Sequence, residues 1–155
     1  MKALRALLKG PAGLKRFINT YAPFLGAGIH LRELSDDYRF MQVDMHLRWY
    51  NKNYVGTHFG GSLYSMVDPF YMLMLLNNLG NDYIVWDKSA QIDFIKPGKG
   101  RVTATFNLTD EMLEDVRTAT ATGDKYLPTW SVEVVDAEGD VVARVNKTLY
   151  IRRKR

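Results

Sequence analysis

The sequence predicts an α+β fold in which a curled, mainly antiparallel sheet wraps around one buried helix. The stretch from Ser62 to Leu79 is apolar on nearly every side, and a helix without a polar face is a buried helix. The flanking segments alternate between apolar and polar residues, as strands do. Because these strands do not alternate with helices along the chain, we expect them to pair antiparallel.

The N-terminal part of the chain, about residues 1–25, is expected to form a helical extension. Its apolar residues recur at helical spacing from Leu4 to Tyr21. Helix-breaking residues are expected to divide this stretch into two short helices: Gly10, Pro11 and Gly13. Three more are expected to end it: Pro23, Gly26 and Gly28.

Two strands are expected before the buried helix and four after it: residues 29–34, 38–50, 84–95, 101–108, 129–135 and 141–151. In the second strand, one face is expected to hold Phe40, Val43, Met45, Leu47 and Trp49. A short helix is expected from Asp110, and residues 136–140 are expected to form a hairpin turn. The chain, residues 1–155, is then a single domain.

The composition is that of a folded protein, and it argues against several kinds of catalytic and metal-binding site. Hydrophobic residues make up 46% of the chain and charged residues 25%. The absence of cysteine excludes thiolate metal ligands and cysteine nucleophiles. No closely spaced histidine pair, glycine-rich phosphate loop or Gly-x-Ser-x-Gly motif is present, so we expect neither a metal site nor a serine triad.

The formal net charge of +4 is concentrated at the two ends of the chain. Nucleic acid, an anionic membrane surface or a phosphate-bearing cofactor would each suit such ends. We favour solvated termini, because no nucleic-acid-binding motif accompanies the charge. Weak membrane contact through the segment Lys2 to Arg16 is kept as an alternative. Without a continuous apolar signal region or a bilayer-spanning stretch, the protein is expected to be cytoplasmic.

The segment from Asn53 to Asp68 resembles the signature of hotdog-fold acyl-CoA thioesterases, most closely the phenylacetyl-CoA thioesterase-like branch. That signature has an Asn, a Gly-Gly pair where the central helix begins, and an acid two turns later: here Asn53, Gly60, Gly61 and Asp68. The resemblance extends over about residues 53–151 and includes the strand that ends at Pro97.

One position departs from the family. The family often has His directly before the Gly pair, whereas here Phe59 holds that place and His58 lies one residue earlier. An uncharacterised bacterial branch of the superfamily resembles this chain in that respect. The family's role for its histidine is therefore not assigned to His58. One consequence of this difference would be a binding pocket with weakened or altered catalysis.

The resemblance implies hydrolysis of an acyl thioester, with the Gly60 N–H donating to the thioester oxygen. The chemistry agrees, because exposed N–H groups at a helix start stabilise an oxyanion and glycine admits a substrate closely. Asp68 is the acid of an otherwise apolar stretch, so it is the candidate base or nucleophile. Asn53 is expected to orient the water or the carbonyl.

Each of these residues also has a structural interpretation. Asp68 precedes Pro69, so it is a candidate for stabilising a local helix break. Gly60 and Gly61 alone would more often form a turn, and Asn53 alone would more often be a turn residue. Their joint spacing is what favours the functional interpretation.

Six further residues are candidates for substrate binding: His58, Phe59, Asp87, Ser89, Lys96 and Arg101. Related thioesterases use a Ser or Thr near the positions of Asp87 and Ser89, and the phosphates of coenzyme A need basic partners such as Lys96 and Arg101. Coenzyme A is expected only as part of an acyl-CoA substrate, and no other cofactor is expected.

Three functions remain in competition. The first is an acyl-CoA thioesterase that uses Asp68, and the second is a non-catalytic acyl- or lipid-binding hotdog protein. A hotdog dehydratase is the third, but that chemistry needs a positioned His, and His58 is poorly placed. A curled sheet leaves an open edge that a second copy can cover, so we expect a homodimer with a shared site, and a tetramer is the alternative.

Overall fold

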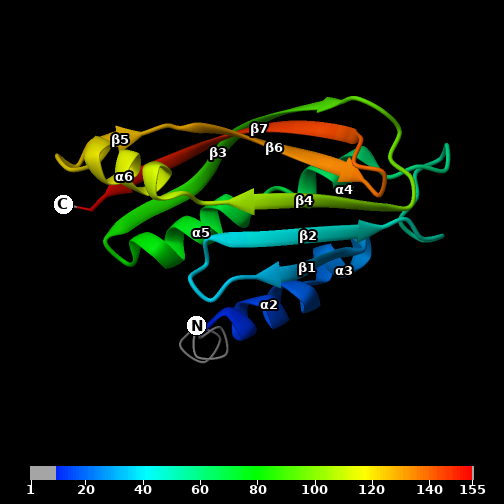
Figure 1. The fold of residues 1–155 in the computed structure, drawn as a ribbon, viewed down its shortest axis with the longest axis horizontal. Helices are drawn as coiled ribbons and strands as arrows, with labels where there is room; N and C mark the ends of the chain where they lie inside the picture. The colour runs from blue at the N-terminus through cyan, green and yellow to red at the C-terminus, as the bar shows by residue number, and fades with distance from the viewer. Residues whose placement is uncertain (1–9, 155) are drawn as a thin grey trace.

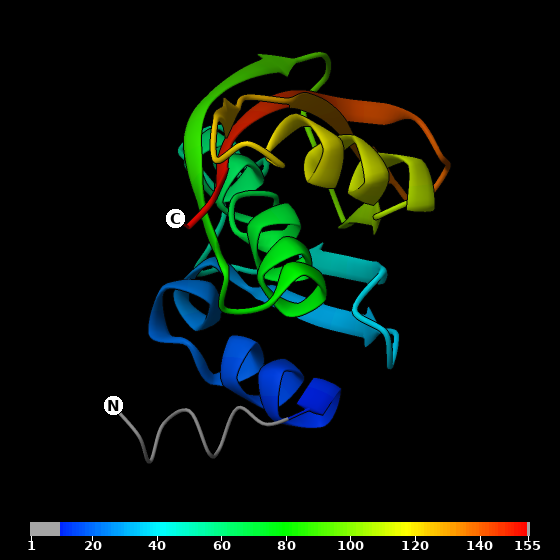
Figure 2. The same ribbon diagram turned by 90° about the vertical axis from the view of Figure 1, so that its left-hand side faces the viewer.

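Over residues 10–154, which the computed structural model describes, seven strands form one antiparallel sheet that curls around a central helical segment (Figures 1 and 2). The strands are β1 Ile29–Leu34, β2 Phe40–His46, β3 Tyr83–Phe94, β4 Arg101–Asn107, β5 Lys125–Tyr126, β6 Thr129–Asp136 and β7 Val141–Arg153. Their order is β1-β2-β4-β6-β7-β3, and β5 pairs with β7. The predicted α+β class is confirmed.

The N-terminal helices differ from the prediction. Helix α2 spans Gly10–Thr20 and helix α3 spans Ala22–Ala27, so Gly10, with a φ of 80°, begins α2, and Pro11 and Gly13 lie in its first turn. Proline is tolerated in a first helical turn because its missing N–H would have no partner there. Pro23 likewise begins α3, whereas Gly28 ends it with a φ of 77°. The expectation for residues 1–9 lies outside the described residues.

The predicted continuous helix from Ser62 to Leu79 is two helices. Helix α4 covers Gly60–Ser65 and helix α5 covers Phe70–Leu79. Residues 66–69 separate them, because Pro69 cannot continue the hydrogen-bond ladder. Asp68 therefore lies at the break, as its structural interpretation anticipated. Burial of the segment is confirmed by its fully buried members: Met66, Val67, Phe70, Met74 and Leu75.

The second predicted strand is too long. Strand β2 ends at His46, and the Leu47 N–H donates to Gly100 O instead of joining a regular ladder. Trp49 is 84% exposed and does not share the inner face of β2, so its assignment to that face was wrong. The predicted helix from Asp110 is confirmed as α6, Asp110–Ala119, which Thr109 caps by accepting from the Met112 N–H.

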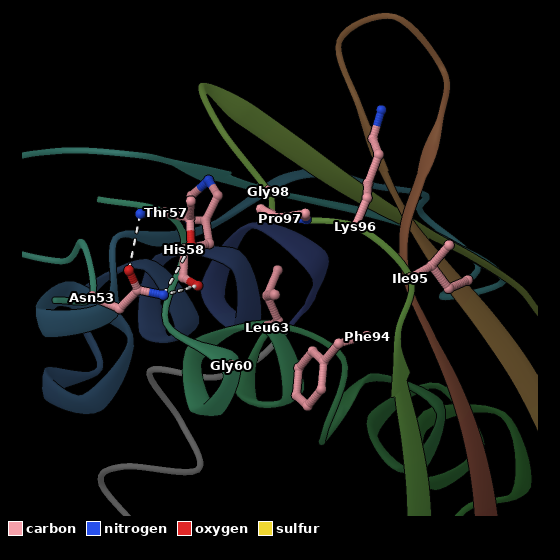
Figure 3. Close-up of a pocket in the computed structure, with 10 residues that line it drawn as sticks. All are labelled: Asn53, Thr57, His58, Gly60, Leu63, Phe94, Ile95, Lys96, Pro97 and Gly98. Atoms are coloured by element: carbon pink, nitrogen blue, oxygen red, sulfur yellow. Dashed lines mark hydrogen bonds between the residues drawn. The ribbon is translucent and has the colours of Figure 1, made fainter. Parts of the chain in front are cut away.

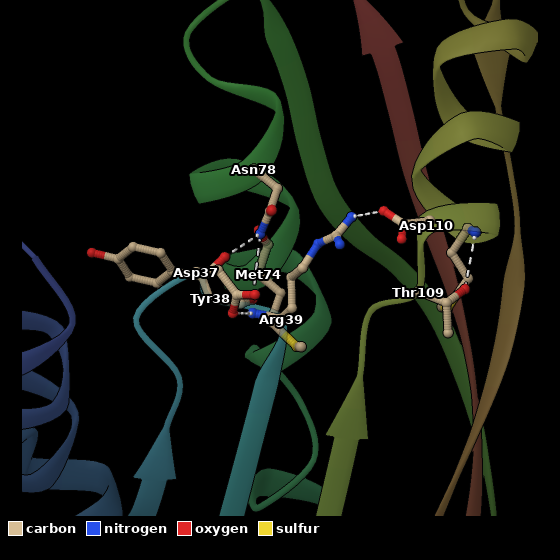
Figure 4. A network of polar contacts seen from close by, with 8 residues as sticks. Asp37, Tyr38, Arg39, Met74, Asn78, Thr109 and Asp110 are labelled. Carbon is tan, nitrogen blue, oxygen red and sulfur yellow. Dashed lines mark hydrogen bonds and ion pairs between the residues drawn. The ribbon is translucent and has the colours of Figure 1, made fainter.

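A polar network fixes the far end of the central helix (Figure 4). Asn78 Nδ2, in α5, donates to Met74 O at 2.9 Å and to the carbonyls of Asp37 and Tyr38 at 3.2 and 3.3 Å. These carbonyls belong to the turn between β1 and β2. The central helix is thus tied to the sheet at the end opposite α4.

One edge of the sheet, β1, is covered by a helix, whereas the other edge, β3, is exposed. At β1, the Leu31 N–H donates to Asn19 Oδ1 at 2.7 Å, and Asn19 Nδ2 donates to Leu31 O at 3.1 Å. Helix α2 thereby closes this edge. At the other end of the sheet β3 pairs only with β7, and most of its residues from Lys88 to Phe94 are exposed. Edges of this kind favour pairing with another chain.

Candidate functional site

Six of the ten predicted site residues fall into two groups. The loop before α4 and the connection from β3 to β4 enclose a pocket of 340 Å³ (Figure 3). Its lining is Asn53, Thr57, His58, Gly60, Leu63, Phe94, Ile95, Lys96, Pro97 and Gly98. The second group surrounds Asp68, at the break between α4 and α5, and its members come from α4, β3 and β7.

Asn53 organises the loop that forms one wall of the pocket. Its Oδ1 accepts from the N–H groups of Val55 and Thr57 at 3.1 and 2.9 Å. Its Nδ2 donates to Thr57 Oγ1 at 2.9 Å and to His58 O at 3.2 Å. An amide has two donor hydrogens and two acceptor lone pairs, so these four bonds occupy the side chain. The geometry therefore gives Asn53 a loop-positioning role.

His58 is buried and connects the same loop to the start of β4. Its N–H donates to Gly98 O at 3.0 Å, and its ring Nε2 lies 3.0 Å from Gly100 O. A carbonyl only accepts, so Nε2 carries the proton and Nδ1 is unprotonated, with no partner among the described residues. Burial lowers the pKa of His58, although its bond to Gly100 acts in the opposite direction. The histidine is neutral and serves to hold the pocket wall.

Gly60 and Gly61 begin α4 as predicted. The N–H groups of Ser62 and Leu63 both donate to Phe59 O, so the first two N–H groups, of Gly60 and Gly61, lie ahead of the helical ladder. A Cβ on Gly60 would lie 2.9 Å from Cζ of Phe94. Because Gly60 has no side chain, the Phe94 ring can pack against the first residue of α4.

Asp68 has a partner that the sequence analysis missed. Lys147 Nζ, from β7, donates to Asp68 Oδ1 at 2.7 Å, and the Tyr64 hydroxyl donates to the same oxygen at 2.8 Å. Asp68 Oδ2 accepts no hydrogen bond from the described residues, and the Asp68 side chain is 43% exposed. One carboxylate oxygen is therefore anchored while the other is available.

Asp87 joins this cluster from β3. Its Oδ1 lies 3.0 Å from Lys147 Nζ, within ion-pair distance, but makes no hydrogen bond of regular geometry. Burial raises the pKa of Asp87, and Lys147 offsets only part of that effect. Burial alone would lower the pKa of the Lys147 ammonium, but the attraction of the Asp68 and Asp87 carboxylates outweighs burial and raises that pKa. The lysine therefore stays charged between two carboxylates.

Lys147 was missed because its signal is faint in the sequence. It occupies an inward position of β7, between the buried Val145 and Leu149. A lysine in the inward register of an otherwise apolar strand is unusual and indicates a buried partner.

The remaining predicted residues do not gather at one point. Ser89 pairs with Thr148, whose neighbours on β7 point inward, so Ser89 faces the outer side of the sheet. A bulge between Asp87 and Ser89 separates the two side chains. Lys96 lines the pocket, but its ammonium is held by Asp136 at 2.6 Å and Asp140 at 2.7 Å.

Two other candidates lie outside the pocket lining. Arg101 is exposed where β4 begins, and Phe59 is 57% exposed on the far side of the loop. Neither is among the residues that enclose the pocket.

Asp68 and Gly60 do not meet within one chain. Gly60 lines the pocket, whereas Asp68 borders a different hollow with residues of α3. Gly60 begins α4, whereas Asp68 lies beyond its end, in the break before α5.

None of the helices is long and apolar enough to cross a membrane in the part of the chain that the structure covers. Over residues 10–154, no group of three or more His, Asp or Glu side chains is arranged to hold a metal ion.

Solved structures of other proteins share the fold. A Pseudomonas aeruginosa protein of unknown function, described as a probable thioesterase, aligns with a TM-score of 0.79 at 19% identity over 92% of this chain and 96% of its own. A Haemophilus influenzae thioesterase aligns with a TM-score of 0.67 at 14% identity over 92% and 90%. A mutant phenylacetic acid degradation protein of Thermus thermophilus gives 0.56 at 23% identity over 82% and 96%.

These likenesses define the class of the protein: it has the hotdog fold found in thioesterases, as the sequence resemblance implied. The chain belongs to the family described as a domain of unknown function, DUF4442, whose model matches residues 10–151. No protein of curated function matches the chain.

Proposed function

We propose that the protein is a homodimeric hydrolase of acyl thioesters, with acyl-CoA as the substrate class. The observation that carries this proposal is the state of Asp68. Tyr64 and Lys147 hold its Oδ1, while Oδ2 is left without a protein donor on a half-exposed side chain. A general base or nucleophile needs such a fixed and accessible oxygen.

The proposed reaction places water between Asp68 and the thioester carbonyl. Asp68 Oδ2 takes a proton as the water oxygen attacks the carbonyl carbon. The N–H groups of Gly60 and Gly61 stabilise the oxyanion that forms. The C–S bond then breaks, and the thiolate leaves with a proton, which gives a carboxylic acid and a thiol. Direct attack by Asp68, followed by hydrolysis of the anhydride, gives the same products.

A homodimer would bring the two groups together. The open edge of β3 begins next to Asp87 and ends at Phe94, which packs against Gly60. Ala90 shares the inner face with Lys147 through their register, yet it is exposed. A second copy paired along β3 would cover this face and place Asp68 of one subunit near the pocket of the other.

The pocket suits the acyl or pantetheine end of the substrate. Its volume of 340 Å³ lies at the low end of small-molecule sites. Leu63, Phe94 and Ile95 supply apolar surface, and the loop held by Asn53 supplies the polar wall. Because Asp136 and Asp140 already hold Lys96, Arg101 is the stronger of the two candidates for a coenzyme A phosphate. The cytoplasmic location stays a prediction.

Release of free thiol from a panel of acyl-CoA substrates tests the proposal. The chain has no cysteine, so a thiol-reactive dye reports only product. We expect turnover with at least one acyl group, and its loss in Asp68→Asn. No turnover across aliphatic and aromatic acyl groups would contradict hydrolysis.

A second candidate is a non-catalytic protein that binds acyl thioesters. Two observations favour it: Phe59 replaces the family's histidine, and Lys147 neutralises the Asp68 carboxylate. Saturable binding of an acyl-CoA without thiol release would identify this function.

A further inference from the structure

Lys147 is fully buried although it is charged. Its side chain is 1% exposed, and its neighbours on the inner face of β7 are the apolar Val145 and Leu149. Burying an ammonium is unfavourable unless partners compensate for the lost water. The partners here are the two carboxylates of Asp68 and Asp87, together with the ring of Tyr64, whose centroid lies 5.3 Å from Nζ.

The two carboxylates interact differently with the Lys147 ammonium. Asp68 Oδ1 accepts a regular hydrogen bond of 2.7 Å from Nζ, whereas Asp87 Oδ1, at 3.0 Å, makes only an ion pair. Asp68 is the more exposed of the two, with 43% of its side chain accessible against 17% for Asp87. Lys147 therefore directs its best hydrogen bond toward the carboxylate that faces the open side.

Asp68 and Lys147 belong to different kinds of backbone segment. Asp68 lies in the break between α4 and α5, where regular helical packing is interrupted. Lys147, in contrast, belongs to a strand with partners on both sides, since it pairs with Ala90 of β3 and Trp130 of β6. A carboxylate on an irregular segment is thus anchored to a strand that is paired on both sides.

We propose that Lys147 is a positioning residue for Asp68: with Tyr64 it holds Oδ1 so that Oδ2 points to the substrate. Asp87 is the counter-charge that keeps the ammonium in place. This inference rests on the proposed function, because it assigns to Lys147 the geometry on which Asp68 chemistry depends.

A purely structural role makes a different prediction. If Lys147 only neutralises the buried Asp87, then removing both charges together should leave Asp68 as active as before. If Lys147 positions Asp68, the same double change should leave a folded protein with a slower chemical step. The comparison is between Asp87→Asn, which keeps the Lys147–Asp68 pair, and Lys147→Met/Asp87→Asn, which lacks it.

We expect the double variant to unfold at a temperature close to that of Asp87→Asn, because neither variant leaves an unpaired buried charge. Its kcat for the best acyl-CoA should be lower than that of Asp87→Asn by on the order of a hundredfold, with KM little changed, as for a misplaced catalytic group. Lys125→Met, at an exposed position of β5 away from the β3 edge, is the matched control and should behave as the wild type.

Equal kcat in the double variant and Asp87→Asn would overturn the positioning role while leaving the proposed hydrolysis intact. Absence of turnover in the wild type would overturn both. An NMR measurement tests the same contact independently of turnover. The ¹⁵N signal of the Lys147 ammonium should shift in Asp68→Asn. An unchanged Lys147 signal would show that the two side chains are not in contact and would also overturn the positioning role.

Discussion

Asn19 closes one edge of the sheet by pairing with the backbone of Leu31, whose N–H donates to Oδ1 at 2.7 Å and whose carbonyl accepts from Nδ2 at 3.1 Å. Helix α2 thereby occupies the place that another strand would take along β1. Strand β3, at the opposite edge, has no such cover among the described residues. We therefore expect dimerisation through β3 and not through β1.

Light scattering at micromolar concentration should report twice the mass of one chain. Gln91→Arg, in the exposed part of β3, should weaken the dimer because it brings like charges together across a two-fold axis. The matched control is His30→Arg, an exposed position of β1, which should remain dimeric. A monomeric wild type, or equal weakening by both changes, would contradict pairing through β3.

Gly60→Ala should separate the two interpretations of the glycine pair. The added Cβ would meet Cζ of Phe94 at 2.9 Å, and that ring is 57% exposed, so it has room to swing away. The melting temperature should therefore change by only a few degrees, while turnover falls on the order of tenfold or more as the oxyanion site is obstructed. Turnover that falls only in proportion to unfolding would assign Gly60 to the turn alone.

Asn53→Ala should destabilise the loop as well as lower activity. The change removes four hydrogen bonds to Val55, Thr57 and His58. At about 1 kcal/mol for each bond, and with water replacing some of them, the free energy of unfolding should drop by about 2–3 kcal/mol. Urea unfolding measures this drop. Unchanged stability with lost turnover would instead indicate a direct contact between Asn53 and the substrate.

His58 should make stability depend on pH. Its pKa is lowered in the folded state, so the unfolded chain binds a proton first as the pH falls below about 6.5. Stability is fully present above that pH and decreases below it, by at most about 1.4 kcal/mol for each pH unit. Urea unfolding at pH 7.5 and pH 5.5 should show this loss in the wild type and a smaller one in His58→Gln. An equal loss in both proteins would exclude His58 as the source.

The sequence predicted the architecture well because the hydrophobic pattern determines it. The apolar stretch from Ser62 to Leu79 identified the central segment, and alternation located the strands. The apolar pattern continues through Met66 and Val67, so it predicted one helix, and only Asp68 and Pro69 indicated the break at residues 66–69. The two-residue strand β5 was missed, since Lys125 and Tyr126 are too few to alternate.

The candidate site was predicted only in part, because its contacts are distant in the sequence. Asp68 and Lys147 are separated by 79 positions, and only the packing of β7 against the central helix brings them together. The spacing of Asn53, Gly60 and Asp68 can be read in the sequence. It does not reveal that the Asn53 side chain makes all four of its hydrogen bonds within the loop. Nor does it reveal that Asp136 and Asp140 hold Lys96.

Asp68→Asn tests the central claim most directly. The amide oxygen can still accept from Lys147 and Tyr64, so the fold and acyl-CoA binding should be largely retained. The amide can neither take a proton nor attack well, so we expect turnover to fall on the order of a hundredfold or more. Turnover and melting temperature are measured on the same preparation. A stable Asp68→Asn protein with turnover near that of the wild type would contradict the account.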